Sequence, residues 1–262
     1  NKNKVDKLAN GISSMSYNSG AFSSDMRGRD DYRVIVGEPL GIVWGFVYDG
    51  IYGVDDFVTY TDDNGKTQFQ FDKSGNYILK EGVTDNTYTT ASSYGGLRPG
   101  AMKLKDQDGD GKITEKGDRV IIGRTQPKFT GGFGLSGNYK WFDISANFNF
   151  VVGNDVYNMD KMVSSQSYRN SYANLRAEMA PVTLGGRAWT YLDQSNGTII
   201  TDYETLKAMN ANASYWSATT MSDNNPVPTS WAVEDGSFLR LQNLTVGFTL
   251  PKDWTRKFAC NQ

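Results

Sequence analysis

The residues with the clearest capacity for chemistry form an acidic loop at 106–114, with the sequence DQDGDGKIT. Calcium prefers six to eight hard oxygen ligands. Alternating aspartates at the first, third and fifth positions of the loop, Asp106, Asp108 and Asp110, can supply three of these oxygens. A glycine at the sixth position, Gly111, permits the sharp turn that brings them onto one ion. The pattern matches the first nine positions of an EF-hand-type calcium loop.

The second half of this loop departs from the EF-hand pattern. The backbone carbonyl of Lys112 occupies the seventh position, and Thr114, at the ninth, can bind directly or through water. The twelfth position is Gly117 instead of a bidentate glutamate, and the nearest carboxylate, Asp118, comes one residue later. The β-branched residues 120–122 argue against a helix after the loop. We therefore expect a structural calcium site without EF-hand architecture; the alternative is a solvated acidic turn without metal.

Composition argues against several other kinds of chemistry. The 262-residue chain has no histidine, one cysteine and a net charge of −2. These counts exclude a His-containing catalytic triad and an internal disulfide framework, and they give no reason to expect a nucleic-acid partner. An enzyme would need a glycosidase-type carboxylate pair, and nothing marks out one pair among 29 acidic residues. We therefore predict that the chain is not an enzyme.

Strands are the elements expected to position the candidate residues. The clearest strand signal in the sequence is at residues 127–152. Apolar side chains alternate with polar ones or glycines along two arms that meet at a turn, 140–143, and this period of two predicts β-strands. The apolar rows are Phe129, Phe133, Leu135, Tyr139 and Trp141 in the first arm, and Ile144, Ala146, Phe148, Phe150 and Val152 in the second. Each arm has the roughly 10 residues that a tilted membrane strand needs. Alternation resumes at 237–250, where Leu239 and Leu241 are out of phase, which predicts a bulge or a buried upper end.

The connections around this hairpin are very unequal in length. Two extended runs, separated by a turn at 37–41, make up residues 33–52. Two polar insertions, 53–125 and 153–235, are far longer than a usual loop. We expect a small hairpin near Asp62–Phe71 and a short helix near Ser171–Met179. No apolar run approaches the roughly 20 residues of a membrane helix. Short turns on one side and long loops on the other are typical of outer-membrane β-barrels.

Several stretches share the order and spacing of one known family. They are 1–5 (NKNKV), 36–41 (VGEPLG), 45–51 (GFVYDGI), Pro99-Gly100 before the acidic loop, Asp118-Arg119 with Ile122-Gly123, 127–129 (PKF), 153–158 (GNDVYN) and 233–241 (VEDGSFLRL). Together they resemble the C-terminal third of the SusC/RagA family of TonB-dependent outer-membrane transporters. The resemblance spans nearly the whole chain.

This resemblance implies a fold, an activity and partners. Residues 1–262 would be the C-terminal portion of a 22-stranded antiparallel transmembrane β-barrel, with the plug domain absent from this chain. Family members import oligosaccharides or peptides across the bacterial outer membrane with energy from the TonB complex, and they work with a SusD-like surface lipoprotein. On this interpretation 53–125 and 153–235 are extracellular loops, the turns at 37–41 and 140–143 are periplasmic, and the calcium loop lies outside the cell.

Aromatic side chains are the candidate contacts with substrate and lipid. Flat rings suit sugar rings or peptide backbones, although most rings of the second long loop are expected to pack that loop against its neighbours. Trp216 and Trp231 are the candidate substrate contacts. The aromatic side chains expected to face lipid are Trp44, Phe46, Phe133, Tyr139, Trp141, Phe148, Phe150 and Phe248. A competing hypothesis is a soluble, calcium-stabilised β-sandwich that binds carbohydrate, in which these rings would be buried against a second sheet.

Overall fold

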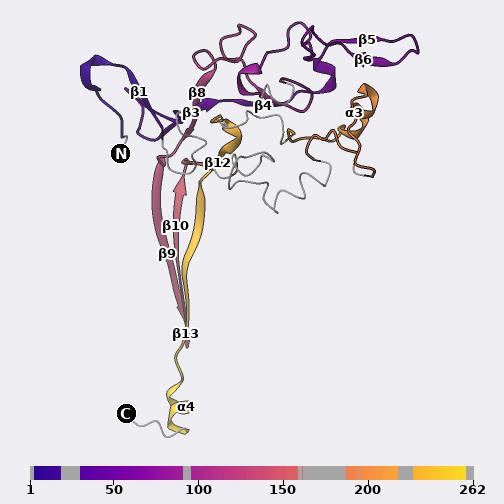
Figure 1. The fold of residues 1–262 in the computed structure, drawn as a ribbon. Helices are drawn as coiled ribbons and strands as arrows, with labels where there is room; N and C mark the ends of the chain where they lie inside the picture. Colours follow the sequence, from indigo (N-terminus) through magenta and orange to yellow (C-terminus); the bar gives the residue numbers. More distant parts are fainter. Residues whose placement is uncertain are drawn as a thin grey trace.

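The computed structural model describes residues 3–18, 30–90, 96–158, 161, 187–193, 195–217 and 227–257. It has two parts, a long three-stranded sheet and a head of short strands at one end of that sheet (Figure 1). Strand β1 (Ser14–Tyr17) lies in the head, and helix α4 (Lys252–Lys257) lies beyond the far end of the sheet. The regular elements among the described residues are mostly strands, with few helices. None of their helices is both long and apolar enough to cross a membrane.

The long sheet confirms the hairpin expected from the alternating pattern. Strands β9 (Phe129–Tyr139), β10 (Phe142–Val152) and β13 (Phe238–Phe248) have 11 residues each and pair antiparallel in the order β13-β10-β9. The turn between β9 and β10 is tight because Lys140 adopts a left-handed conformation, with φ of 54°. β10 therefore has a partner along both edges, whereas β9 and β13 are edge strands of this sheet.

The register of the three strands places the apolar rows on one face. Phe148 pairs with Phe133 on one side and Leu241 on the other. The register with β13 shifts between Asn147 and Phe148, and this confirms the predicted bulge. A bulge changes the phase of one strand, so Leu239 and Leu241 lie on the same face as the apolar residues that follow. The pairing puts three rows on this face: Phe129, Phe133, Leu135 and Tyr139; Phe142, Ile144, Ala146, Phe148, Phe150 and Val152; and Leu239, Leu241, Leu244, Val246 and Phe248.

This apolar face is exposed instead of packed. Leu135 is 61% exposed and Val246 is 64% exposed. The opposite face carries the polar rows Thr130, Ser136 and Asn138; Asp143, Ser145, Asn147 and Asn149; and Arg240, Asn243 and Thr245. The long sheet is thus apolar on one side and polar on the other.

The head consists of four small antiparallel sheets with a few short helices. Its largest sheet has the order β1-β2-β3-β8. The strands of the head are β1 (Ser14–Tyr17), β2 (Tyr32–Ile35), β3 (Ile42–Phe46), β4 (Tyr48–Ile51), β5 (Thr59–Thr61), β6 (Thr67–Phe69), β7 (Met102–Leu104), β8 (Arg119–Arg124), β11 (Asp155–Tyr157) and β12 (Val233–Asp235). The helices are η1 (Ala9–Gly11), η3 (Val54–Asp56), η4 (Thr87–Thr89), α3 (Tyr203–Met209) and η7 (Ser230–Ala232), while α4 (Lys252–Lys257) follows the long sheet.

The predicted small hairpin is present in the head. Strands β5 and β6 pair across a turn in which the carboxylate of Asp62 accepts hydrogen bonds from the backbone N–H groups of Asn64 and Lys66, each at 2.9 Å. The helix expected near 171–179 lies outside the described residues. The only α-helix described in the second long insertion is therefore α3, which begins with Asp202 accepting a hydrogen bond from the N–H of Thr205.

Two buried clusters hold the head together, and each joins both long insertions. The first comprises Phe46, Met102, Leu104, Ile113, Trp216, Val227 and Ala232. The second comprises Tyr52, Val54, Phe57, Phe69, Leu97, Ala101, Trp189, Tyr203 and Leu206. A backbone hydrogen bond also connects the two insertions, from Ser217 N to Gly100 O at 2.8 Å, and another joins the second insertion to β3, from Phe46 N to the carbonyl of Pro228 at 2.8 Å.

Two expectations for 33–52 are wrong. Phe46 was expected to face lipid but is only 1% exposed, and Trp44 is half-buried beneath the guanidinium of Arg33, 4.3 Å from the ring centre. The turn at 37–41 was expected on the periplasmic side with 140–143. It lies instead at the head end of the long sheet, where Glu38 pairs with Arg124 at 3.2 Å. These residues belong to the head because β3 pairs with β2 and β8 and not with the long strands.

Candidate metal site in the acidic loop

The structure brings three of the predicted calcium ligands together. Carboxylate oxygens of Asp106, Asp108 and Asp118 lie within 4.8 Å of one another. Asp118 is fully buried, whereas Asp108 is exposed. The carboxylate that comes one residue late by EF-hand spacing is therefore the one that joins the first two aspartates.

Hydrogen bonds to backbone N–H groups shape the loop around this cluster. The two carboxylate oxygens of Asp106 accept from Gly109 at 2.6 Å and from Gly111 at 2.8 Å. Those of Asp118 accept from Gln107 at 2.8 Å and from Thr114 at 2.6 Å. Asp118 thus ties the beginning of the loop to its end, which explains why it is buried.

The glycine at the twelfth position has a steric role that the sequence did not reveal. A Cβ on Gly117 would lie 2.1 Å from Oδ2 of Asp108 and 3.0 Å from Oγ1 of Thr114. A side chain at this position would therefore displace the Asp108 carboxylate. The departure from the EF-hand pattern leaves room for oxygens contributed by other residues.

The other predicted ligands have different surroundings. Asp110 lies outside the group of three, and its Oδ1 accepts a hydrogen bond from the N–H of Lys112 at 2.8 Å. Thr114 Oγ1 accepts from the N–H of Gly117 at 3.0 Å. The loop is anchored to the head by Asp85, whose N–H donates to Gly111 O and whose carbonyl accepts from Ile113 N, both at 2.8 Å. Ile113 itself lies in the first buried cluster.

The carboxylates of the loop repel one another without a compensating cation. Hydrogen bonds from Gly111 and Gly109 lower the pKa of Asp106. The N–H of Asp110 lowers the pKa of Asp108, but partial desolvation and the neighbouring carboxylates of Asp110, Asp118 and Asp106 outweigh it, so this pKa is raised. No ion pair among the described residues includes Asp106, Asp108 or Asp118. An all-oxygen, negatively charged cluster of this kind fits a hard divalent cation.

The two tryptophans expected to contact substrate lie in the core of the head. Trp216 is 0% exposed; its ring stacks on Tyr215 at 4.3 Å and crosses that of Trp231 at 4.4 Å. A fully buried ring cannot touch a ligand, so the prediction for Trp216 does not fit the structure. Trp231 is half-buried, with the Lys161 ammonium 4.3 Å above its ring, and its role as a substrate contact stays a prediction.

Comparison with known proteins gives consistent relatives, although no protein-family model matches the chain. TonB-dependent receptor P39 of Formosa agariphila is 27% identical over 239 residues, which cover 87% of this chain and 20% of the receptor. TonB-dependent receptor P3 of the same organism is 28% identical over 268 residues, which cover 98% of this chain and 19% of the receptor. The chain therefore spans about a fifth of the length of these curated relatives.

Two solved structures also align with most of the chain. A structure of the RagAB peptide importer in the closed-closed state matches 96% of this chain and 20% of its own, with a TM-score of 0.46 and 17% identity. A structure of the RagAB peptide transporter matches 99% of this chain and 20% of its own, with a TM-score of 0.47 and 18% identity.

Proposed function

We propose that this chain, whose curated homologues are TonB-dependent receptors, forms part of the barrel wall and the extracellular region of an outer-membrane nutrient importer. The observation that carries this proposal is the exposed apolar face of the long sheet, with its polar opposite face. An apolar surface of this size is unfavourable in water. In an outer-membrane barrel the same face contacts lipid while the polar face lines the interior.

The dimensions of the long sheet support this proposal. Eleven residues extend roughly 36 Å along a strand, and a strand tilted by about 45° then crosses about 25 Å of apolar membrane. Aromatic side chains gather at the turn end of the sheet, where Phe142 pairs with both Tyr139 and Phe248, and Trp141 lies in the turn. Aromatic girdles occupy this position at the boundary between lipid and water.

The two edges of the long sheet favour a larger barrel. β9 and β13 each use one edge to pair with β10, and an unpaired strand edge is costly within lipid. Further strands of the same barrel would pair with both edges. We propose the 22-stranded barrel of the family, with the 140–143 turn in the periplasm and the head, which includes 53–125 and 153–235, outside the cell. The cargo would be an oligosaccharide or a peptide, the partners a SusD-like lipoprotein and the TonB complex.

The acidic loop is the proposed Ca²⁺ site of this extracellular head. Asp106, Asp108 and Asp118 would bind the ion, and Asp110, the carbonyl of Lys112 and Thr114 are the candidates for further oxygen ligands. A bound cation would neutralise the repulsion within the cluster and join the two ends of the loop. Its role would be structural, because Ile113 anchors the loop in the core of the head.

The membrane proposal is tested by comparing the chemical accessibility of the two faces of the long sheet. Cys260 is first replaced by Ser in the intact protein. Single cysteines are then introduced at two pairs of adjacent positions: Leu135 and Ser136, and Val246 and Thr245. In outer membranes, a lipid-phase thiol reagent should label the Leu135 and Val246 positions and should spare their neighbours. Equal access of a water-soluble maleimide to Leu135 and Val246 in folded protein would exclude a lipid-facing wall.

The import proposal is tested by uptake. Cells that carry the intact protein should accumulate labelled oligosaccharide or peptide, and cells without TonB should not.

The competing hypothesis of a soluble β-sandwich predicts that a second sheet covers the apolar rows. The exposure of Leu135, Val246 and Phe133 gives that hypothesis no support.

A further inference from the structure

A hollow of about 560 Å³ lies at the junction of the head and the long sheet. Four separate segments line it: the N-terminal Asn3 and Lys4, the turn at 37–39, the connection from Arg124 to Lys128, and Gly153 at the end of β10. None of these residues has a part in the acidic loop or in the two buried clusters. The hollow is therefore a separate feature of the molecule.

The hollow has an excess of positive charge. Its lining includes three cationic side chains, Lys4, Arg124 and Lys128, and one acidic side chain, Glu38. Arg124 and Glu38 form an ion pair at 3.2 Å. Among the described residues, no ion pair includes Lys4 or Lys128. Both lysines are exposed. Two ammonium groups thus remain available to an anion.

The backbone around these lysines is fixed before any ligand binds. The N-terminal segment is held to the turn by hydrogen bonds from Val5 N to Glu38 O at 2.9 Å and from Gly37 N to Val5 O at 2.8 Å. Lys128 N donates to Val152 O at 2.9 Å, which continues the pairing of β9 with β10. A preformed frame reduces the entropy lost when a ligand binds.

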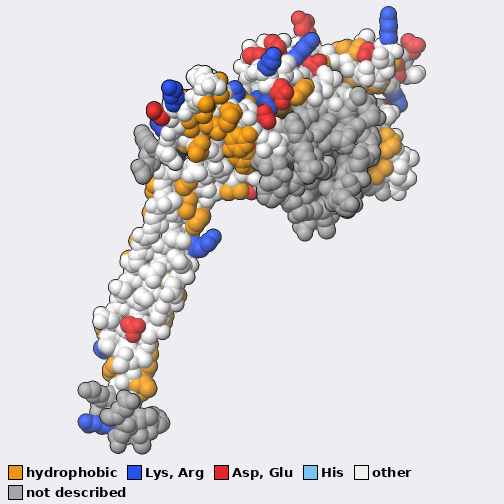
Figure 2. All heavy atoms as spheres, turned by 60° about the vertical axis from the view of Figure 1, so that its left-hand side comes forward, with side chains coloured by type: hydrophobic (Ala, Val, Ile, Leu, Met, Phe, Trp, Pro, Cys, Tyr) orange, Lys and Arg blue, Asp and Glu red, His pale blue; other side chains and the backbone are white. Residues whose placement is uncertain are grey.

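The position of Lys128 relates the hollow to the polar face of the sheet. Lys128 directly precedes Phe129, and successive strand residues point to opposite faces, so Lys128 belongs to the polar face. A Cβ on Gly153 would lie 2.7 Å from the Lys128 side chain, so this glycine makes room for the lysine. Arg240 lies on the same polar face at the head end of β13. Asp143 also lies on this face, but at the opposite end of the sheet, beside the 140–143 turn. Figure 2 shows cationic side chains around the upper end of the long sheet.

We propose that this basic hollow binds a carboxylate of an anionic cargo molecule at the extracellular mouth of the import path. The inference rests on the proposed function, because only in a barrel does the polar face line a path for cargo. An ammonium group and a carboxylate form a charge-assisted hydrogen bond. The two lysines would therefore favour uronate-containing oligosaccharides or acidic peptides over neutral ligands of the same size.

The test compares two trisaccharides, one with carboxylates and one with neutral hydroxymethyl groups at C6. Binding of trigalacturonate and of neutral galactotriose to the intact transporter in detergent is measured by titration calorimetry. We expect trigalacturonate to bind more tightly, and Lys4→Gln and Lys128→Gln each to weaken its binding about fivefold, with about tenfold or more for the double variant. Galactotriose binding should not change. The preference should also shrink as salt is raised, because both lysines are exposed.

Two control variants make the result decisive. Lys73→Gln removes an exposed lysine elsewhere in the head and should leave the preference intact. Lys128→Arg keeps the charge and should retain most of it. A folded double variant that still prefers trigalacturonate, or a wild type without any preference, overturns the inference. Neither outcome affects the cysteine-labelling test, so the anion site can fail while the membrane proposal stands, and the reverse.

Discussion

The long sheet and the head use the same alternating sequence pattern in opposite ways. In β9 every residue is exposed, whereas in β3 four of five residues are buried. In both 42–46 and 144–150, apolar side chains recur at every second position. In the head, segments distant in the sequence cover β3; along the long sheet no described segment covers the apolar row. Alternation thus specifies a strand with two different faces, and the environment of each face depends on what packs against it.

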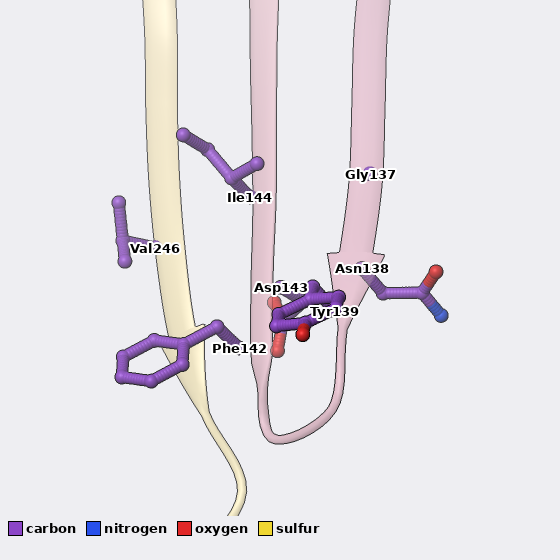
Figure 3. Close-up of a pocket in the computed structure, with 7 residues that line it drawn as sticks. All are labelled: Gly137, Asn138, Tyr139, Phe142, Asp143, Ile144 and Val246. Carbon is purple, nitrogen blue, oxygen red and sulfur yellow. The ribbon is translucent and has the colours of Figure 1, made fainter.

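The close-up of the turn end of the long sheet makes this difference concrete (Figure 3). Gly137, Tyr139, Phe142, Ile144 and Val246 of the apolar face line an open hollow of about 450 Å³, and Asn138 and Asp143 of the opposite face complete its lining. The side chain of Asn138 points away from Ile144 and Val246. A Cβ on Gly137 would meet no atom within 4 Å. In the head, by contrast, a Cβ on Gly45 would lie 2.3 Å from the Pro228 carbonyl oxygen. The head is packed internally, and the long sheet needs an external apolar partner.

The largest expected effect is the loss of a buried ring in the head. Trp216→Ala should lower the free energy of unfolding of the head by about 3–5 kcal/mol, because it leaves a cavity in the first cluster. Trp141→Ala, at the exposed turn of the long sheet, should cost less than about 1 kcal/mol. Urea unfolding of the intact protein followed by circular dichroism, with limited proteolysis of the head, measures both. Similar costs for the two variants would contradict the contrast between the parts.

A charge on the apolar face gives the next largest effect. Leu244→Lys, near the middle of β13, should cost about 2–4 kcal/mol in a bilayer. Asn243→Lys, one residue away on the polar face, should cost much less because its ammonium reaches water. Folding into lipid vesicles at increasing urea compares the two. The same cost for both lysines would show that the sheet does not separate lipid from water.

Calcium should stabilise the head but not the long sheet. Calcium at 100 times its dissociation constant adds about 2.7 kcal/mol, so the melting temperature of the head should rise with calcium and fall with EDTA. Asp108→Asn should abolish this response, whereas Asp63→Asn, an exposed acid in the β5–β6 turn, should keep it. A response that survives Asp108→Asn, or no response in the wild type, would refute the proposed site.

The raised pKa of Asp108 predicts how the stability of the calcium-free head depends on pH. The ionised form of Asp108 is less favourable in the folded loop than in the unfolded chain. At neutral pH it therefore lowers the free energy of unfolding of the head. That penalty is relieved as pH falls toward the raised pKa. Asp108→Asn should therefore leave the calcium-free head at least as stable as the wild type at neutral pH. A loss of stability in EDTA would contradict the repulsion inferred here.

The smallest effect concerns an exposed contact between the two long insertions. The hydroxyl of Tyr203 and the ammonium of Lys207 both donate to Asp55 and lower its pKa below the ordinary value of 3.8. The stabilisation is complete above this ordinary pKa and is lost as pH falls through the lowered one. Lys207→Met should cost less than about 1 kcal/mol, since the pair is largely exposed. Melting curves of wild type and Asp55→Asn should converge as pH falls below the lowered pKa of Asp55; a constant difference would contradict this contact.

Short-range signals in the sequence predicted the long sheet well. The rows at 129–150 identified both strands and their turn, and the phase change at Leu239 and Leu241 predicted the bulge in β13. These features follow from local alternation and backbone preference. The acidic loop was also recognisable from its three aspartates and two glycines at fixed spacing, although the structure groups Asp106 and Asp108 with Asp118 and leaves Asp110 outside this group.

The features that the sequence could not predict depend on distant contacts. Gly117 is explained only by the Asp108 oxygen beside it, and Trp216 is buried only because Phe46, Met102 and Val227 surround it. The turn at 37–41 has the composition of any tight turn, and only the pairing of β3 with β8 places it at the head end of the sheet.

The sequence by itself therefore determined where strands form, which residues share a face and which carboxylates share a loop. Each of these depends on repeats of two residues or on spacings within one loop. The tertiary structure decided which faces are buried, which end of the sheet carries the head and which lysines meet at its junction. Burial and charge depend on groups that are far apart along the chain and become neighbours only in the folded molecule.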